Sequence, residues 1–242
     1  MVISFFKSQA RDLLREKKDP LLKFSLAYFG IIALLNTLSF YLTMPSGGIN
    51  AYLTAMESGD WEDFMMSISR SSGGSGLISY LISFVSQILF YGFLMMLLNA
   101  MHNRETVIGN LFDGFSLWWQ IILLEFLRGL LIGLACLLFI IPGFILAYSY
   151  RLAPYLLIQN PNMDVIECLK ESRVRMRGHK FELFALDLSF IGWILLSIIP
   201  ILGWILNIWL TPYMNLSVLY FCEALCPPAP QLETIADDSF FE

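Results

Sequence analysis

Several residue types that enzymes and metal proteins depend on are scarce in this sequence. The 242 residues include two histidines and four cysteines, with no C-x-x-C pair, so we expect neither a metal site nor a cofactor. The chain has no H-E-x-x-H motif, phosphate-binding glycine loop or nucleophile elbow. An intramembrane serine protease needs a histidine in a membrane span, and His102 and His179 both fall outside the expected spans. An intramembrane aspartyl protease needs two facing aspartates, and Asp187 is the one aspartate inside the expected spans. We predict that the protein is not an enzyme.

Charge is also scarce. Charged residues make up 14% of the chain and hydrophobic residues 57%, against about 25% charged in an average soluble domain. This composition predicts an integral membrane protein, for which the net charge of −5 says little about partners. We expect no nucleic acid partner. Six apolar stretches approach the ~20 residues that cross a bilayer core, and they cover residues 21–42, 76–99, 116–140, 143–159, 182–199 and 201–222.

Lysine and arginine residues are concentrated before the first expected span and between the fourth and fifth. The positive-inside rule places both regions in the cytoplasm, and an even number of spans then returns the C-terminus to that side. The first span is too long for a cleavable signal peptide, so we expect it to stay as an anchor. The four cysteines should be reduced thiols. The basic residues concerned are Lys7, Arg11, Arg15, Lys17, Lys18, Lys23, Lys170, Arg173, Arg175, Arg177 and Lys180.

A proline-marked hairpin occurs twice. Ile140-Ile141-Pro142 is followed by Pro154-Tyr155, and Ile198-Ile199-Pro200 is followed by Pro212-Tyr213 at the same spacing. The repeated unit is a short amphipathic segment, an apolar run, a turn and a second apolar run. We therefore predict an all-α polytopic membrane protein. Its six transmembrane helices form three hairpin repeats, each preceded by an in-plane amphipathic helix, and the first repeat is much diverged.

Amphipathic segments precede each pair of spans, at residues 1–19, 101–115 and 160–181. We expect them on the cytoplasmic membrane surface, where basic residues attract anionic lipid headgroups. Residues 43–75 form the one sizeable outward loop, with two short helices expected on either side of Gly59. The loop is either a lid on the outer leaflet or a site for an external partner or gate. Residues 1–225 thus form a single membrane domain, and residues 226–242 a disordered, acidic cytoplasmic tail.

Four charged residues fall inside the expected spans: Glu125, Arg128, Arg151 and Asp187. Each costs about 2.5–3.5 kcal/mol at mid-membrane on insertion scales, so a span keeps such a residue when it is paired or functional. Glu125 and Arg128 share a helix face, and the long side chain of Arg151 could reach Asp187. Two interpretations stay open. The residues form either a polar cavity that binds a headgroup, ion or proton, or an ion-pair cluster that locks the repeats together.

Prolines mark the turns and the second helix of both clear repeats. Pro142 and Pro200 mark the turns, and we expect Pro154 and Pro212 to free a backbone carbonyl and kink their helices. Kinks at matching points of two repeats either point to a transporter site or serve helix shape. We interpret the other polar residues in spans as interhelical hydrogen-bond partners rather than ligands. They are Asn36, Ser39, Gln87, Asn99, Asn207 and Asn215.

Two stretches of the sequence resemble a known bacterial family. One runs from Ile141 to Tyr155 and the other from Glu171 to Trp193, with Asn160-Pro161 between them. They resemble the integral-membrane family catalogued as domain of unknown function 975, common in Gram-positive species, over most of the chain from the second span onward. The resemblance implies a six-span fold in a bacterial plasma membrane. It implies no activity, substrate or catalytic residue.

Two functional hypotheses follow. In the first, the protein binds or transports a small amphiphilic, lipid or peptide ligand through its intramembrane charged residues, and neutralising Asp187 abolishes binding. In the second, it is a scaffold or accessory subunit whose cytoplasmic amphipathic helices bind a membrane-protein partner or a second copy of the chain. Deleting residues 2–18, or reversing Arg173, Arg175 and Arg177, would then abolish partner recovery.

Overall fold

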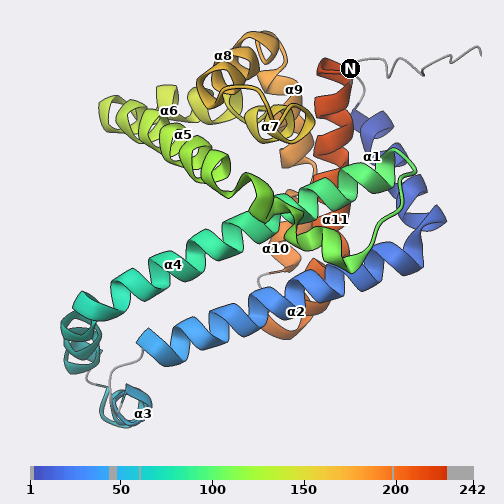
Figure 1. Ribbon diagram of the computed structural model, residues 1–242. Helices are drawn as coiled ribbons and strands as arrows, with labels where there is room; N and C mark the ends of the chain where they lie inside the picture. The colour runs from blue at the N-terminus through green and yellow to red at the C-terminus, as the bar shows by residue number, and fades with distance from the viewer. Residues whose placement is uncertain (1–2, 44–47, 60, 198, 228–242) are drawn as a thin grey trace, which may run out of the picture. The chain divides into compact units, whose positions relative to one another are not determined.

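The computed structural model describes residues 3–43, 48–59, 61–197 and 199–227 (Figure 1). Every regular element in these ranges is a helix, as predicted. The elements in chain order are α1 (Ile3–Glu16), α2 (Lys18–Thr43), α3 (Gly48–Ser58), α4 (Trp61–Met101), the 3-10 helix η1 (Ile108–Leu117), α5 (Trp118–Leu138), α6 (Ile140–Ser149), α7 (Ala153–Gln159), α8 (Val165–Arg175), α9 (Lys180–Leu188), α10 (Ile191–Leu196) and α11 (Pro200–Leu225).

The chain divides into two compact units. Unit 1 comprises Met1–Ala10, Leu124–Ile191 and Leu216–Glu242, and unit 2 comprises Arg11–Leu123 and Gly192–Asn215. Helices α1, α5, α10 and α11 therefore contribute residues to both units. The single membrane domain expected over residues 1–225 stays a prediction, and most of the expected tail, residues 228–242, lies outside the described residues.

Four helical stretches among the described residues are long and apolar enough to cross a membrane. They are Lys18–Leu42, Leu77–Met101, Ile108–Leu138 and Ile140–Gln159, and they correspond to the first four expected spans. Large apolar side chains such as Leu34, Leu137 and Ile140 are exposed on them, and lipid tails would cover such side chains in a bilayer. The chain therefore has the character of a membrane-associated protein.

The expected fifth span, residues 182–199, is divided into two short helices. α9 ends at Leu188 and α10 begins at Ile191. The hydroxyl of Ser189 donates to the carbonyl of Leu186 at 2.6 Å, and a serine that bonds to a preceding carbonyl in this way competes with regular helix geometry. α11, with 26 residues, covers the expected sixth span. The stretch before Pro142 is the single helix α5, whereas the matching stretch before Pro200 is divided into α9 and α10. The two copies of the sequence repeat therefore differ here.

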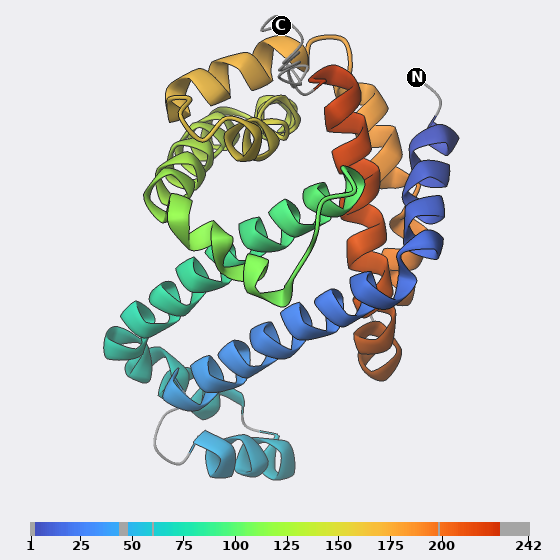
Figure 2. The same ribbon diagram turned by 45° about the vertical axis from the view of Figure 1, so that its right-hand side comes forward.

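Unit 2 is built on α4, which packs against both η1 and α2. α2 and α4 lie side by side (Figure 2), and the rings of Tyr28 and Phe93 stack between them with centroids 4.7 Å apart. η1 approaches α4 backbone to backbone through two glycines. A Cβ on Gly92 would lie 1.9 Å from the carbonyl oxygen of Leu111, and one on Gly114 would lie 2.4 Å from that of Ile88.

The segment expected to face outward, residues 43–75, contains one short helix and the beginning of a long one. α3 ends at Ser58, and Gly59 adopts a φ of +74°, which glycine tolerates best. This is the position where a break is expected. The second short helix is instead the first part of α4, which starts at Trp61 and runs without interruption through the glycine- and serine-rich residues 71–76.

Unit 1 surrounds α7. The α7 side chains Ala153, Tyr155, Leu156 and Leu157 are all buried, and α8 packs against α7. The hydroxyl of Ser172 on α8 donates to the carbonyl of Ser149 at the end of α6, at 2.8 Å.

The end of α11 is held by the same two helices. Tyr155 donates to the carbonyl of Cys226 at 3.4 Å, and Arg175 donates to that of Leu225 at 3.2 Å. Cationic and hydroxyl donors at a helix C-terminus satisfy carbonyls that have no partner within the helix. Residues far apart in the sequence are thereby fixed around α7.

Two of the three amphipathic segments expected on the membrane surface bury apolar side chains against protein. The apolar residues of α1 (Phe6, Ala10, Leu13 and Leu14) are buried by protein contacts, including a Phe6 to Phe221 ring contact at 5.5 Å. α8 likewise buries its apolar side within unit 1. The segment 101–115 is helical only from Ile108, within η1. Protein contacts therefore bury these apolar side chains of α1 and α8, and the location of both helices at the membrane surface stays a prediction.

Candidate functional site

The first pair of intramembrane charges is joined on α5. Arg128 and Glu125 form an ion pair at 2.7 Å, three residues apart on one helix face, as their spacing predicts. Both side chains are half-buried. The pair neutralises two charges within a candidate span, which removes most of the cost of keeping either of them in an apolar environment.

The second pair of intramembrane charges is arranged differently. Asp187 on α9 accepts a hydrogen bond from the hydroxyl of Tyr148 on α6 at 3.2 Å. Arg151 lies in the turn between α6 and α7, where it is exposed and acts electrostatically on the same hydroxyl. Within the described part of the chain, Arg151 and Asp187 form no ion pair. Tyr148 is not among the site residues expected from the sequence, and it connects Asp187 to another helix.

The prolines occupy four different local settings. Pro142 lies in the first turn of α6 and Pro200 is the first residue of α11, where a missing N–H costs little. Pro154 is near the start of α7, after a turn at residues 150–152, so it begins a new helix instead of kinking a continuous one. Pro212 lies inside α11. The two copies of the repeat therefore diverge at the matching pair Pro154 and Pro212.

Glycines close both proline-marked turns. A Cβ on Gly143 would lie 2.1 Å from the sulfur of Cys136, and one on Gly203 would lie 2.0 Å from the carbonyl oxygen of Ser197. In each hairpin, a glycine after the proline thus allows the second helix to pass close to the chain before the turn. This feature is common to both copies.

Lys7 lies at the break between α9 and α10. Its ammonium group donates to the carbonyl and to the hydroxyl of Ser189, at 3.3 and 3.1 Å. It also lies 4.2 Å from the centroid of the Phe190 ring, within the range of a cation–π interaction. A lysine of α1 therefore binds the carbonyl end of α9, where a positive charge is favoured. From the sequence, Lys7 is expected only among the basic residues of the first amphipathic segment, near lipid headgroups.

A polar groove of about 410 Å³ lies between α2 and α4 in unit 2. Tyr28 and Phe90 contribute aromatic lining. The polar residues that line it are Asn36, Ser39, Ser79, Ser83, Ser86 and Gln87. We call this the Asn36 groove. Its polar residues come from two stretches that otherwise satisfy the apolar requirement for membrane spans.

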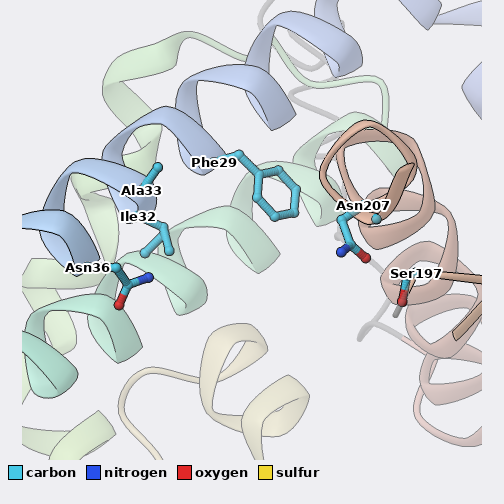
Figure 3. A pocket seen from close by; sticks show the side chains of 7 residues that line it. Phe29, Ile32, Ala33, Asn36, Ser197 and Asn207 are labelled. Carbon is cyan, nitrogen blue, oxygen red and sulfur yellow. The ribbon is translucent and has the colours of Figure 1, made fainter. Parts of the chain in front are cut away.

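A second cavity of about 330 Å³ shares Ile32 and Asn36 with the Asn36 groove. On its other side it is lined by Asn207 of α11 and by Ser197, which follows α10. Figure 3 shows Phe29, Ile32 and Asn36 on α2 facing the space opposite Asn207 and Ser197. Asn36 is therefore at the boundary of two adjoining cavities in one unit.

Part of this site could be identified from the sequence. Asn36, Ser39, Gln87 and Asn207 are among the polar residues that we interpreted as interhelical hydrogen-bond partners, and all four line the two cavities. The serines of α4 were missed. Ser79, Ser83 and Ser86 follow the spacing of one helix face, and that spacing was the available indication. Asn215, by contrast, donates to Thr211 of its own helix at 2.9 Å.

The cysteines are free thiols. Cys168 on α8 is fully buried, and burial raises the pKa of its thiol to about 11. Burial also raises the pKa of Cys226. Among the described residues, no group of histidine, cysteine and acidic side chains has the arrangement of a metal site.

Comparison with known proteins supports the resemblance noted from the sequence. Residues 134–227 match the model of a family described as "Protein of unknown function (DUF975)". The match begins near the end of α5 and runs past α11, so it is shorter than the expected coverage from the second span onward. No curated protein and no solved structure matches the chain. The matched description carries no activity, so a functional conclusion depends on the geometry.

Proposed function

We propose that the protein binds a small amphiphilic molecule within the membrane, in the Asn36 groove. The observation that carries this proposal is the convergence of six polar side chains on one groove between two otherwise apolar helices. Polar residues inside membrane spans are kept for interhelical hydrogen bonds or for a ligand. A groove of about 410 Å³ falls within the range of small-molecule sites.

The chemistry of the lining favours an uncharged polar head. Among the described residues that line the groove and the adjoining cavity, none carries a charge. The serine hydroxyls of Ser83 and Ser86 donate to carbonyls of their own helix at 2.8 and 2.9 Å, which leaves their oxygen lone pairs as acceptors. Asn36 and Gln87 supply both donors and acceptors. A ligand with hydroxyl or amide groups on an apolar body suits this surface.

The charged residues then have a structural role. Arg128 neutralises Glu125 within α5, and Tyr148 fixes Asp187 to α6. On this view Asp187→Asn lowers thermal stability, because a neutral amide accepts a weaker hydrogen bond from Tyr148 than a carboxylate does. Ligand binding stays in place, because Asp187 does not line the groove. Our proposal thus keeps the ligand class expected from the sequence and moves the site from the charged residues to the Asn36 groove.

Binding of an uncharged amphiphile to full-length protein in neutral detergent tests the proposal. Monoolein should raise the melting temperature of the wild type, and oleate, which carries a charged head, should raise it less. Asn36→Leu should weaken monoolein binding roughly threefold to tenfold, the value of one neutral hydrogen bond. Asn215→Leu makes the same change outside both cavities and should leave binding unchanged. Equal monoolein affinity in the two variants would place the ligand elsewhere.

The scaffold hypothesis is favoured by one separate observation. Arg11, Arg15 and Arg173 are exposed on α1 and α8, whereas the apolar sides of these helices are buried. A protein partner would therefore contact charged side chains and leave the apolar ones in place. Arg175 is unsuitable for a test, because it binds Glu171 and the end of α11. Reversing Arg173 and Arg177 alone should abolish recovery of a partner in a pull-down if the protein is a scaffold.

A further inference from the structure

α8 carries exposed basic side chains that the Asn36 groove does not use. Lys170 and Arg173 are exposed on α8, and Arg177 is exposed in the turn that follows it. Spacings of three, four and seven residues bring these side chains to one side of a helix. Ile166 and Val174, 48% and 53% exposed, lie along the same side. We call Lys170, Arg173 and Arg177 the basic stripe.

The packing of unit 1 keeps the basic stripe on the side of α8 that faces away from the protein. The opposite side of α8 is buried through Val165, Cys168 and Leu169, and the hydroxyl of Ser172 binds the carbonyl of Ser149 at 2.8 Å. α8 therefore cannot rotate to bury its basic side chains against the protein without breaking this packing.

Acidic neighbours do not neutralise the stripe. Glu171 pairs with Arg175 on a different side of α8, and this hydrogen bond raises the pKa of Arg175. Asp164 and Glu167 lie at the N-terminal end of α8, where carboxylates are stabilised by the helix dipole. Glu167 lies three residues before Lys170 and borders the stripe there, whereas Arg173 and Arg177 have no acidic residue three or four positions away. The stripe thus keeps an excess of positive charge.

The chain holds α8 close to the end of a candidate span. Residues 160–164 connect Gln159, the last residue of that span, to α8, and five residues reach at most about 18 Å. α8 also packs along α7, which is the final part of the same span. The polar headgroup layer of a bilayer extends several ångströms beyond its apolar core. If this candidate span crosses a bilayer, the headgroup layer at its end is within reach of α8.

We propose that the basic stripe binds the phosphate groups of anionic lipids in the surrounding bilayer. Lys170, Arg173 and Arg177 supply charge and hydrogen-bond donors to the phosphates. Ile166 and Val174 contact the boundary between headgroups and acyl chains. Charge complementarity and the short connection to a span together identify bilayer lipid as the occupant, in preference to a soluble polyanion.

Native mass spectrometry of the full-length protein in neutral detergent, with equimolar phosphatidylglycerol and phosphatidylcholine, tests this proposal. The wild type should retain phosphatidylglycerol preferentially. Each basic residue near an anionic membrane surface raises the affinity for anionic lipid about fivefold. The triple variant Lys170→Gln, Arg173→Gln, Arg177→Gln should therefore lose about 100-fold of the preference for phosphatidylglycerol. The charge-preserving variant Lys170→Arg, Arg173→Lys, Arg177→Lys should keep most of it.

Three results would overturn the proposal. The first is a wild type without lipid preference, and the second is a triple glutamine variant that keeps the wild-type lipid ratio. The third is a single-stranded oligonucleotide that binds the stripe more tightly than phosphatidylglycerol does. The last result would assign the stripe to a soluble polyanion. The three side chains are exposed, so the variants should keep the wild-type melting temperature. If the triple variant does not fold, the single variants Lys170→Gln and Arg173→Gln must each show the fivefold loss.

Discussion

Two glycines, Gly92 on α4 and Gly114 on η1, occupy positions where any side chain would meet a neighbouring backbone. Backbone atoms cannot rotate away as the end of a flexible side chain can. The sequence contains 16 glycines, and nothing in its local pattern distinguishes these two from the others. Their importance comes from the position of a second element, which is a property of the folded chain.

Gly92→Ala should destabilise the protein by about 1–3 kcal/mol, because the new methyl group would lie 1.9 Å from the carbonyl oxygen of Leu111. Thermal unfolding in detergent measures the effect. Gly133→Ala is the matched control, since nothing lies within 4 Å of its Cβ position in α5. That change should be neutral or stabilising, because alanine favours a helix. Equal melting temperatures for the two variants would contradict the close approach.

The thiol of Cys168 should resist alkylation in the native protein. Only the thiolate reacts, and a pKa raised to about 11 keeps this buried thiol protonated through neutral and mildly basic pH. Peptide mass spectrometry after N-ethylmaleimide treatment at pH 7.5 should find Cys168 unmodified, and unfolding in SDS should expose it to rapid modification. Fast native labelling at an unchanged melting temperature would show that the packing of α8 within unit 1 does not cover the Cys168 thiol.

At the scale of elements, the break between α9 and α10 is the main departure from the sequence prediction. Residues 182–199 are apolar enough to suggest one helix, yet Ser189 bonds to the carbonyl of Leu186 and Lys7 binds the carbonyl of Ser189. The first contact is local and the second comes from the other end of the chain. Hydropathy detects neither, since it sums transfer free energies without regard to partners.

Lys7→Met should lower stability by about 1 kcal/mol, through loss of the charge at the end of α9 and of the contact with the Phe190 ring. Hydrogen exchange at Ser189 and Phe190 should become faster, and Lys7→Arg should preserve slow exchange. Lys18→Met removes an exposed lysine at the start of α2 and serves as the comparison. Unchanged exchange at the break in Lys7→Met would mean that Ser189 alone determines it.

At the scale of the whole molecule, the sequence predicted the class of fold and the first four candidate spans. These depend on runs of about 20 apolar residues, which composition alone specifies. It also predicted the ion pair of Glu125 and Arg128, because both residues lie on one helix. The partner of Asp187 could not be found in this way, since Tyr148 lies 39 positions away on a different helix.

The candidate site shows the same division between local and distant information. The spacing of Ser79, Ser83 and Ser86 marks a polar side of α4, and Asn36 marks α2. That these two sides face one groove depends on how the helices pair. The pairing in turn depends on contacts such as the stacked rings of Tyr28 and Phe93. Periodicity therefore identifies surfaces, and only tertiary packing identifies a site.

The contact of η1 with α4 through Gly92 and Gly114 also bears on biosynthesis. The peptide backbones touch there, so no acyl chain can pass between the two elements. α4 is made first, and the segment that carries η1 follows it out of the ribosome. For this contact to form, the two must associate before lipid separates them, so the insertion machinery should release them into the bilayer together.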